Sequence, residues 1–508
     1  MFAVYAAIIL GLFYVARRFG CTRAFTWVFV FLAGAAYLGW GALHPADWDE
    51  IEQLHSMYLV SEGLVPFVDF WQIHSPLLWV VLAPGLEALP ETGAVLLISR
   101  CLYLLLSLIL FSIIWRLSRH LWGEQADLCA TLLVFLSVGI VSQFLWIRPD
   151  AIMLLGAMAA IGLALAGFEG ERGSRFFLSG LALALGLTFS HKVLLWCLLV
   201  PISSLVLYRR RPGRMAATVA LHMAGVATGV VPLAVYLSVH HLWEGFRRWV
   251  VEYHGKPITL HLSLESGHVL LLAAAAVIVI LVGLSRLPTG RVRVGRVVFG
   301  TATFLILTSA VFLYPIEQPW FCYYLAPLFL LSAVLCSWIG RPSANGAGLI
   351  RAVLIPGLLL AGLTFSHFRS LVDTHHRELR LGDSIAIIDG LLERARNRPV
   401  YCVIPFHPIF TRDASPFYLP WQTIHLERKR DTRKKRMLIE FFSARPDFAA
   451  DLMESGPGVL DERRLHRSTG LLVAEGLLPP ARARALLEWA ARHYHRERIR
   501  GREYLVRD

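Results

Sequence analysis

Long apolar segments separated by short polar ones fill the first two thirds of the chain. A helix needs about 20 apolar residues to cross the hydrocarbon core of a bilayer, so each long segment predicts a transmembrane span. The predicted spans are 2–16, 24–43, 93–115, 126–145, 150–167, 175–190, 193–208, 215–239, 267–285, 297–314, 321–339 and 349–367. Segment 77–89 is shorter and carries Pro84 and Glu87, which favours an interfacial or re-entrant helix.

The remainder, 368–508, has no apolar run of that length and holds 26 Lys or Arg and 19 Asp or Glu. Proline-bounded PVYCVIP at 399–405 predicts a buried strand, and amphipathic periodicity predicts helices near 384–397, 433–443 and 481–497. We expect a small α/β domain. Two segments of this domain have open roles. The basic run 427–437 is either a solvated helix face or a contact for anionic lipid headgroups or phosphorylated glycans. The aromatic loop 404–421 either lines the acceptor groove or docks the tail on the membrane domain.

Composition and charge agree with a membrane protein. The chain has 508 residues, 56% of them hydrophobic, and a mean hydropathy of +0.57, well above soluble domains. The net charge of +13 suggests nucleic acid, but the Lys and Arg gather in alternate loops, 17 in one set and five in the other. By the positive-inside rule the first set is cytoplasmic. We then expect three segments to lie outside the cytoplasm: loop 44–92, loop 240–266 and the tail. This arrangement indicates a bacterial plasma membrane protein. It also explains the positive charge without a nucleic-acid partner.

The loop 44–92 concentrates acidic residues close to the membrane boundary. Charged groups there are costly unless they are solvated or used, so the cluster is a functional-site hypothesis. Its acids are Asp47, Asp49, Glu50, Glu52, Glu62 and Asp69, and residues 44–79 contain no Lys or Arg. The alternative is structural, with Asp47 or Asp49 capping a helix over 50–61.

The pattern of this loop resembles the first outer loop of the C-type (GT-C) glycosyltransferases. The matching residues are the pair Asp49-Glu50, then Gly63, Pro66 and Asp69, then Pro76 and Leu77. The comparators are protein O-mannosyltransferases and the aminoarabinose transferase of lipid A, and the resemblance covers roughly residues 24–340. One departure is His74-Ser75-Pro76, where the lipid A enzymes have Lys-Pro-Pro.

The resemblance implies a polytopic α-helical membrane enzyme that moves a sugar from a polyprenyl-phosphate carrier to an acceptor hydroxyl with inversion. Its expected partners are the lipid-linked donor, membrane lipids, and a lipid, glycan or protein acceptor. The family's essential acid falls on Asp49, with Glu50 beside it. The family's Q-Y-Y-L-x-P segment near the lipid phosphate corresponds to Gln318, Tyr323 and Tyr324, which otherwise belong to an interfacial aromatic belt.

Two cations at outer helix junctions are candidates for binding the donor phosphate. Arg148 in Ile147-Arg148-Pro149-Asp150 offers a planar fork to a phosphate, or pairs with Asp150. For Lys192 there are two interpretations. Its ammonium either stabilises the negative charge of the leaving phosphate or extends to the membrane–water interface.

A cofactor is not assigned from the sequence. The outer His and Asp residues leave a divalent metal open, but no helical spacing gathers the histidines around an acid. The seven cysteines show no CxxC spacing, which argues against a zinc finger or a disulfide framework. A transporter or flippase of a glycolipid or a polyprenyl-linked sugar is the alternative function. It requires polar groups near the bilayer midplane, whereas those of this chain gather at outer helix ends, with Arg100 as the exception.

Overall fold

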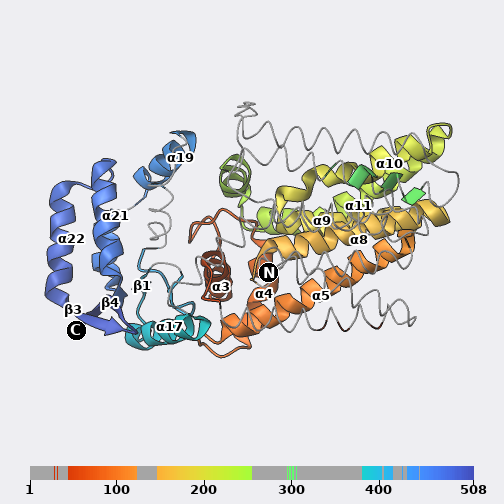
Figure 1. The fold of residues 1–508 in the computed structure, drawn as a ribbon. Helices are drawn as coiled ribbons and strands as arrows, with labels where there is room; N and C mark the ends of the chain where they lie inside the picture. The colour runs from red at the N-terminus through yellow and green to blue at the C-terminus, as the bar shows by residue number, and fades with distance from the viewer. Residues whose placement is uncertain are drawn as a thin grey trace, which may run out of the picture. The chain divides into compact units, whose positions relative to one another are not determined.

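The computed structural model describes residues 44–122, 146–253, 380–402, 405–415, 432–445 and 447–508, together with isolated positions near 24–31, 294–305 and 426. The described chain is mostly helical, with one small sheet (Figure 1). Its contacts divide it into two compact units. The first comprises 1–41, 101–235 and 256–377, and the second comprises 42–100, 236–255 and 378–508.

Among the described residues, three helices are long and apolar enough to cross a membrane: Val95–Leu117 within α5 (Val95–Trp122), α8 (Pro149–Gly170) and α11 (Pro212–Val239). They correspond to the predicted spans 93–115, 150–167 and 215–239. The predicted span 175–190 is the shorter helix α9, Gly173–Phe189. The predicted span 193–208 is also a shorter apolar helix, Val193–Leu207, in which a 3₁₀ segment, η2 (His191–Leu198), leads into a short α10 (Leu199–Leu207). The other predicted spans lie outside the described residues, wholly or except for isolated positions.

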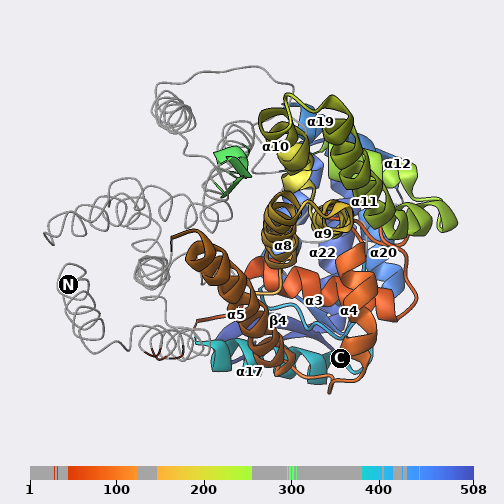
Figure 2. The same cartoon turned by 90° about the vertical axis from the view of Figure 1, so that its right-hand side faces the viewer.

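Small residues bring α8, α9 and α11 close together. A methyl group added at Gly180 of α9 would lie 2.0 Å from the carbonyl oxygen of His222 in α11, and one at Gly225 would lie 2.0 Å from that of Phe177. Between α8 and α9, Ser179 Oγ donates to the carbonyl of Ala160 at 2.9 Å. Figure 2 shows these helices side by side. Backbone approach through small residues is how membrane helices associate without a hydrophobic driving force.

The second unit joins three segments that the charge asymmetry predicts to be outside. The loop after residue 43 contributes α3 (Trp48–Ser61) and α4 (Leu77–Glu87), the latter being the short helix predicted over 77–89. The segment 236–255 contributes α12 (Trp243–Phe246) and the π-helical turn η3 (Arg247–Glu252). The tail contributes the rest.

The tail is an α/β fold built on a four-stranded sheet in the order β1-β2-β4-β3. β1 (Val400–Tyr401) pairs parallel with β2 (Val459–Leu460), and β4 (Arg502–Arg507) pairs antiparallel with both β2 and β3 (Tyr494–Ile499). Arg500 and Gly501 both have positive φ and form the tight β3–β4 turn. The helices are α17 (Leu381–Ala395), α19 (Thr432–Ser443), α20 (Phe448–Ser455), α21 (Glu462–Ala474) and α22 (Pro480–His493).

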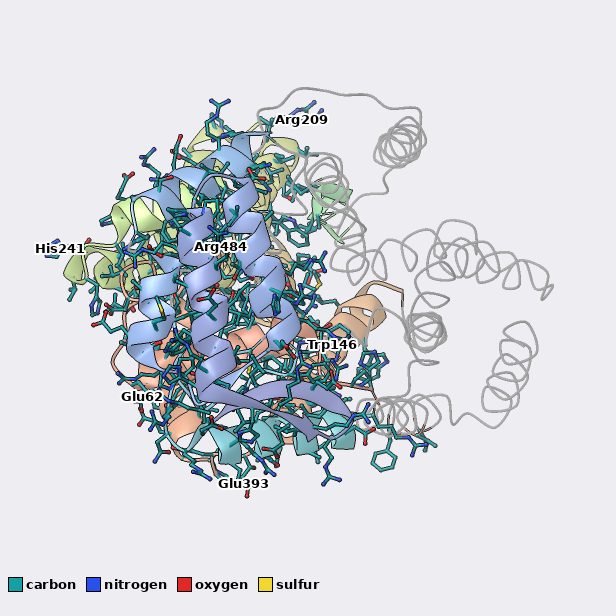
Figure 3. All side chains as sticks on the ribbon, turned by 90° about the vertical axis from the view of Figure 1, so that its left-hand side faces the viewer. Glu62, Trp146, Arg209, His241, Glu393 and Arg484 are labelled. Carbon is teal, nitrogen blue, oxygen red and sulfur yellow. The ribbon has the colours of Figure 1, made fainter. Side chains whose placement is uncertain are left out.

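The core of the tail lies between α17 and the sheet, where Ile387 and Leu391 pack on Val400 and Val459. Exposed charges such as Glu393 of α17 and Arg484 of α22 cover the outer surface (Figure 3). The three helices predicted in the tail are present, but the third ends at His493. Residues 494–497 belong to β3 instead, which pairs with β4 and buries Tyr494 and Ile499 at its two ends.

Candidate functional site

The acidic loop folds into α3, whose first turn is fixed by a capping box. Asp47 is the N-cap and accepts a hydrogen bond from the backbone N–H of Asp49 at 3.0 Å, while Glu50 Oε2 accepts from the N–H of Asp47 at 3.3 Å. The two acids satisfy backbone donors that a helix start leaves unpaired. The capping alternative is therefore confirmed for Asp47, and the position of Asp49 in the first turn is set by its neighbours.

Glu50 also forms a buried ion pair with Arg100 of α5. Arg100 Nη2 lies 2.7 Å from Glu50 Oε2 and its Nε lies 2.8 Å from Oε1, with the side chains 1% and 0% exposed. The same guanidinium donates to the carbonyls of His44 and Pro45. Burial raises the pKa of Glu50, and the Arg100 charge opposes that rise. The absence of Lys and Arg from residues 44–79 was a misleading signal, because the partner lies further along the chain.

α3 is an interior helix with polar side chains on several faces. Gln53 Oε1 accepts from Trp79 Nε1 at 2.7 Å, and Ser56 Oγ accepts from Gln72 Nε2 at 2.7 Å. Buried polar groups of this kind fix one geometry, because each hydrogen bond is costly to lose. Asp49 is half-buried on this helix. The helix thus holds the predicted catalytic acid in a rigid setting.

The motif after α3 builds a turn. Gly63, with φ of +81°, ends the helix in the left-handed region that other residues rarely adopt. Asp69 Oδ2 then accepts from the N–H of Val65 at 2.7 Å, and a bridge joins Pro66 to Phe70. His74 is half-buried in the bend before α4. Three residues of the glycosyltransferase-like pattern therefore shape this turn: Gly63, Pro66 and Asp69.

A buried cluster of His55, His407 and Asp413 lies between α3 and the tail. Asp413 Oδ2 is 2.8 Å from His55 Nε2, and its Oδ1 is 3.2 Å from His407 Nε2. The two imidazole centroids are 4.1 Å apart. The other ring nitrogen of His55, Nδ1, donates to the carbonyl of Ile409 at 2.9 Å.

The electrostatics of this cluster follow from burial and proximity. Burial, together with the nearby His55 ring, lowers the pKa of His407 to about 4, so its imidazole is neutral at physiological pH. Burial favours the neutral form of Asp413, but the two histidines outweigh it and lower its pKa to about 2. An ionised carboxylate therefore faces two imidazoles, and the three side chains are at most 3% exposed.

The segment 405–415 holds His407 and Asp413 in place. The end of this segment pairs with β1 through two backbone hydrogen bonds. The N–H of Val400 donates to the carbonyl of Arg412 at 2.9 Å, and the N–H of Ala414 donates to the carbonyl of Val400 at 2.8 Å. Phe410 packs edge-on against Tyr58 of α3, with ring centroids 5.8 Å apart. These described residues pack the loop against α3 within the second unit.

Three further contacts join the acidic loop to the tail. The N–H of Ala46 donates to Ser384 Oγ at 3.2 Å, and the N–H of Gly93 donates to Asp389 Oδ1 at 2.6 Å. Arg412 reaches Glu62 at 3.2 Å, at the surface. The loop and the tail are thus packed as one body.

The Ile147-Arg148-Pro149-Asp150 motif forms the start of α8 in the first unit. Arg148 occupies the N-cap position and is 8% exposed, and its guanidinium lies 5.1 Å from the Trp146 ring centroid. Its carbonyl accepts from Tyr103 Oη of α5 at 3.0 Å. Asp150 is buried in the first helical turn, where a negative charge is favourable. Arg148 and Asp150 are thus placed within the first unit, and Asp49, Glu50, Asp69 and His74 within the second.

The remaining candidates are described in part or not at all. The backbone of Lys192 belongs to η2, but its side chain lies outside the described residues, as do Gln318, Tyr323 and Tyr324. The basic run is described from residue 432. There Arg433 and Arg436 are exposed, whereas Lys434 is 3% exposed with its Nζ 4.9 Å from the Tyr253 ring centroid. The expectation of a solvated face was therefore wrong for Lys434, which packs inside.

Sequence reasoning missed the His55–His407–Asp413 cluster. His55 stands 352 positions before His407 and 358 before Asp413, so no spacing rule connects them. One signal was available, since the loop 404–421 was already unusual in its aromatic and proline content.

Comparison with known proteins adds no family assignment. A scan against protein-family models and a search of curated proteins both find no match to this chain.

Proposed function

We propose that the chain is a membrane glycosyltransferase that moves a sugar from a polyprenyl-phosphate carrier to an acceptor hydroxyl at the outer face. The observation that carries this proposal is the setting of Asp49. It stands half-buried in the first turn of α3, between the capping residue Asp47 and the buried Glu50–Arg100 pair. A base held by rigid neighbours is what proton abstraction in the transition state requires.

In the proposed reaction, Asp49 accepts the proton of the acceptor hydroxyl as its oxygen bonds to the anomeric carbon. The bond from that carbon to the phosphate oxygen breaks on the opposite face, so the configuration inverts and polyprenyl phosphate leaves. Arg148 and Lys192 are the proposed countercharges for the leaving phosphate. Glu50 acts on Asp49 indirectly, through its capping bond and its pair with Arg100.

The alternative is a transporter or flippase that moves the lipid-linked sugar without breaking a bond. The two functions differ in their product. Purified protein in detergent, given polyprenyl-phosphate-linked sugars and a lipid or glycan extract, should release free polyprenyl phosphate and form a glycosylated acceptor. Mass spectrometry distinguishes the outcomes, because a flippase leaves the donor intact. An intact donor across donors of several sugar classes would overturn the proposal.

We predict that the tail lies outside the cytoplasm. This prediction rests on the distribution of Lys and Arg, with 17 in the predicted cytoplasmic loops and five in the predicted outer loops. A reporter active only in the cytoplasm, fused after Asp508, should be silent, and one active only outside should be functional. Strong activity of the cytoplasmic reporter would place the acidic loop on the wrong side for an external donor.

We predict that Arg148→Ala and Lys192→Ala each slow turnover in the folded protein. Losing one charge-assisted contact to a developing phosphate should raise the barrier by about 2–4 kcal/mol, as for the loss of an oxyanion-hole donor. Arg211→Ala is the matched control, because that side chain is 67% exposed in a predicted cytoplasmic loop. Rates equal to the control in both variants would remove the two cations from the donor site.

A further inference from the structure

The buried His55–His407–Asp413 cluster has the arrangement of a metal centre. One ligand atom from each residue lies within 4.8 Å of the others, and all three residues are buried. In a tetrahedral zinc site with bonds of about 2.0–2.1 Å, neighbouring ligand atoms are about 3.3 Å apart. The distances from Asp413 oxygens to the two Nε2 atoms are 2.8 and 3.2 Å, so a small outward movement makes room for an ion.

The second hydrogen bond of His55 supports this interpretation. Its Nδ1 donates to the carbonyl of Ile409 at 2.9 Å while Nε2 points at the cluster. Metal-ligating histidines characteristically donate their other ring N–H to a backbone carbonyl or a carboxylate, which fixes the tautomer and aims the lone pair.

We propose that His55, His407 and Asp413 bind one divalent transition metal, with Zn²⁺ the best match, and that this ion fastens the tail to α3. Two imidazoles and one carboxylate suit zinc, which takes such ligands in tetrahedral geometry. Soft-metal sites use thiolates, and Ca²⁺ or Mg²⁺ sites use oxygen donors, so neither fits this set. A water or another donor completes the fourth position.

The position of the ligands assigns the ion a fastening role. His55 comes from α3, and the other two come from a segment that is itself bonded to β1 of the tail. The bound ion would therefore join the helix that carries Asp49 to the domain packed against it. Asp49 is not among the ligands, so this proposal stands or falls independently of glycosyl transfer.

The test is the metal content of the full-length protein purified in detergent without a histidine tag. Inductively coupled plasma mass spectrometry should find about one Zn²⁺ per chain, as for a structural site. His407→Gln and Asp413→Asn should each reduce the zinc to background. His495→Gln is the matched control, because His495 and Asp508 form a His–Asp pair 2.7 Å apart that is exposed on the surface, and it should retain the metal.

A second measurement uses the unmodified chain, so that a misfolded variant cannot decide the matter. Chelation should lower the melting temperature of the wild-type protein, and added Zn²⁺ should restore it. Co²⁺ in its place should give the visible absorption bands of a tetrahedral site. A wild-type protein without zinc, whose melting temperature responds to neither chelator nor Zn²⁺, would overturn the proposal and leave the cluster as a hydrogen-bonded contact.

Discussion

Asp49→Asn is expected to reduce sugar transfer by about 10²–10⁴-fold, the usual cost of losing a general base. Asparagine keeps the size of the side chain but does not take up a proton at neutral pH. The backbone N–H of residue 49, which donates to Asp47, is unchanged by the substitution, so α3 should form normally. The measurement is the initial rate of release of polyprenyl phosphate by purified protein, with donor binding measured separately and expected to survive.

Asp47→Asn is the matched control for this experiment. Asparagine is as good an N-cap as aspartate, so the variant keeps α3 while removing a carboxylate two residues from Asp49. It should transfer sugar at close to the wild-type rate. An active Asp49→Asn beside an inactive Asp47→Asn would mean that the base is misassigned, and full activity in both would mean that this pair is not catalytic.

Arg100→Met is expected to destabilise the protein by about 3–5 kcal/mol, because it leaves the Glu50 carboxylate buried without its countercharge. Both side chains are almost fully enclosed, so water does not replace the lost partner. The measurement is the melting temperature and denaturant midpoint of the detergent-purified protein. The double variant Arg100→Met with Glu50→Gln removes both charges and should recover much of the loss.

The pair of Arg496 and Glu462 is the matched control for burial, because its arginine is exposed. Its atoms are also 2.7 Å apart, but the Arg496 side chain is 71% exposed. Arg496→Ala should leave the melting temperature unchanged within error, because solvent replaces the contact. Equal effects of Arg100→Met and Arg496→Ala would show that the Glu50–Arg100 pair does not hold α3 in place.

Local signals in the sequence predicted the elements but not their partners. Apolar length was enough to locate α8 and α11, and Asp47 or Asp49 as a helix cap indicated the start of α3. The 3₁₀ segment around Lys192 and the strand after His493 were missed, because tertiary packing overrides the local pattern there. Two of the six acids in residues 44–79 have basic partners later in the chain, Arg100 for Glu50 and Arg412 for Glu62.

In the candidate site, too, the sequence predicted a residue within a local motif but not a contact between distant segments. Asp49 was predicted by a local motif, and its place in the first turn of α3 follows from the cap that Asp47 and Glu50 form. The His55–Asp413 contact joins residues 358 positions apart, and nothing local in either segment specifies the other. Histidines counted along the outer loops did not converge because two of the three relevant groups belong to one loop of the tail.

The central claim is that this chain breaks the bond between a sugar and polyprenyl phosphate. The most direct measurement compares, by mass spectrometry, the lipids and surface glycans of cells that express the wild-type chain, Asp49→Asn, or neither. We expect one glycan or lipid species that carries an added sugar only with the wild-type chain, and a matching excess of lipid-linked donor in the other two. Identical spectra with Asp49→Asn and the wild-type chain, both differing from cells without the gene, would contradict catalysis by Asp49 and favour transport of the donor.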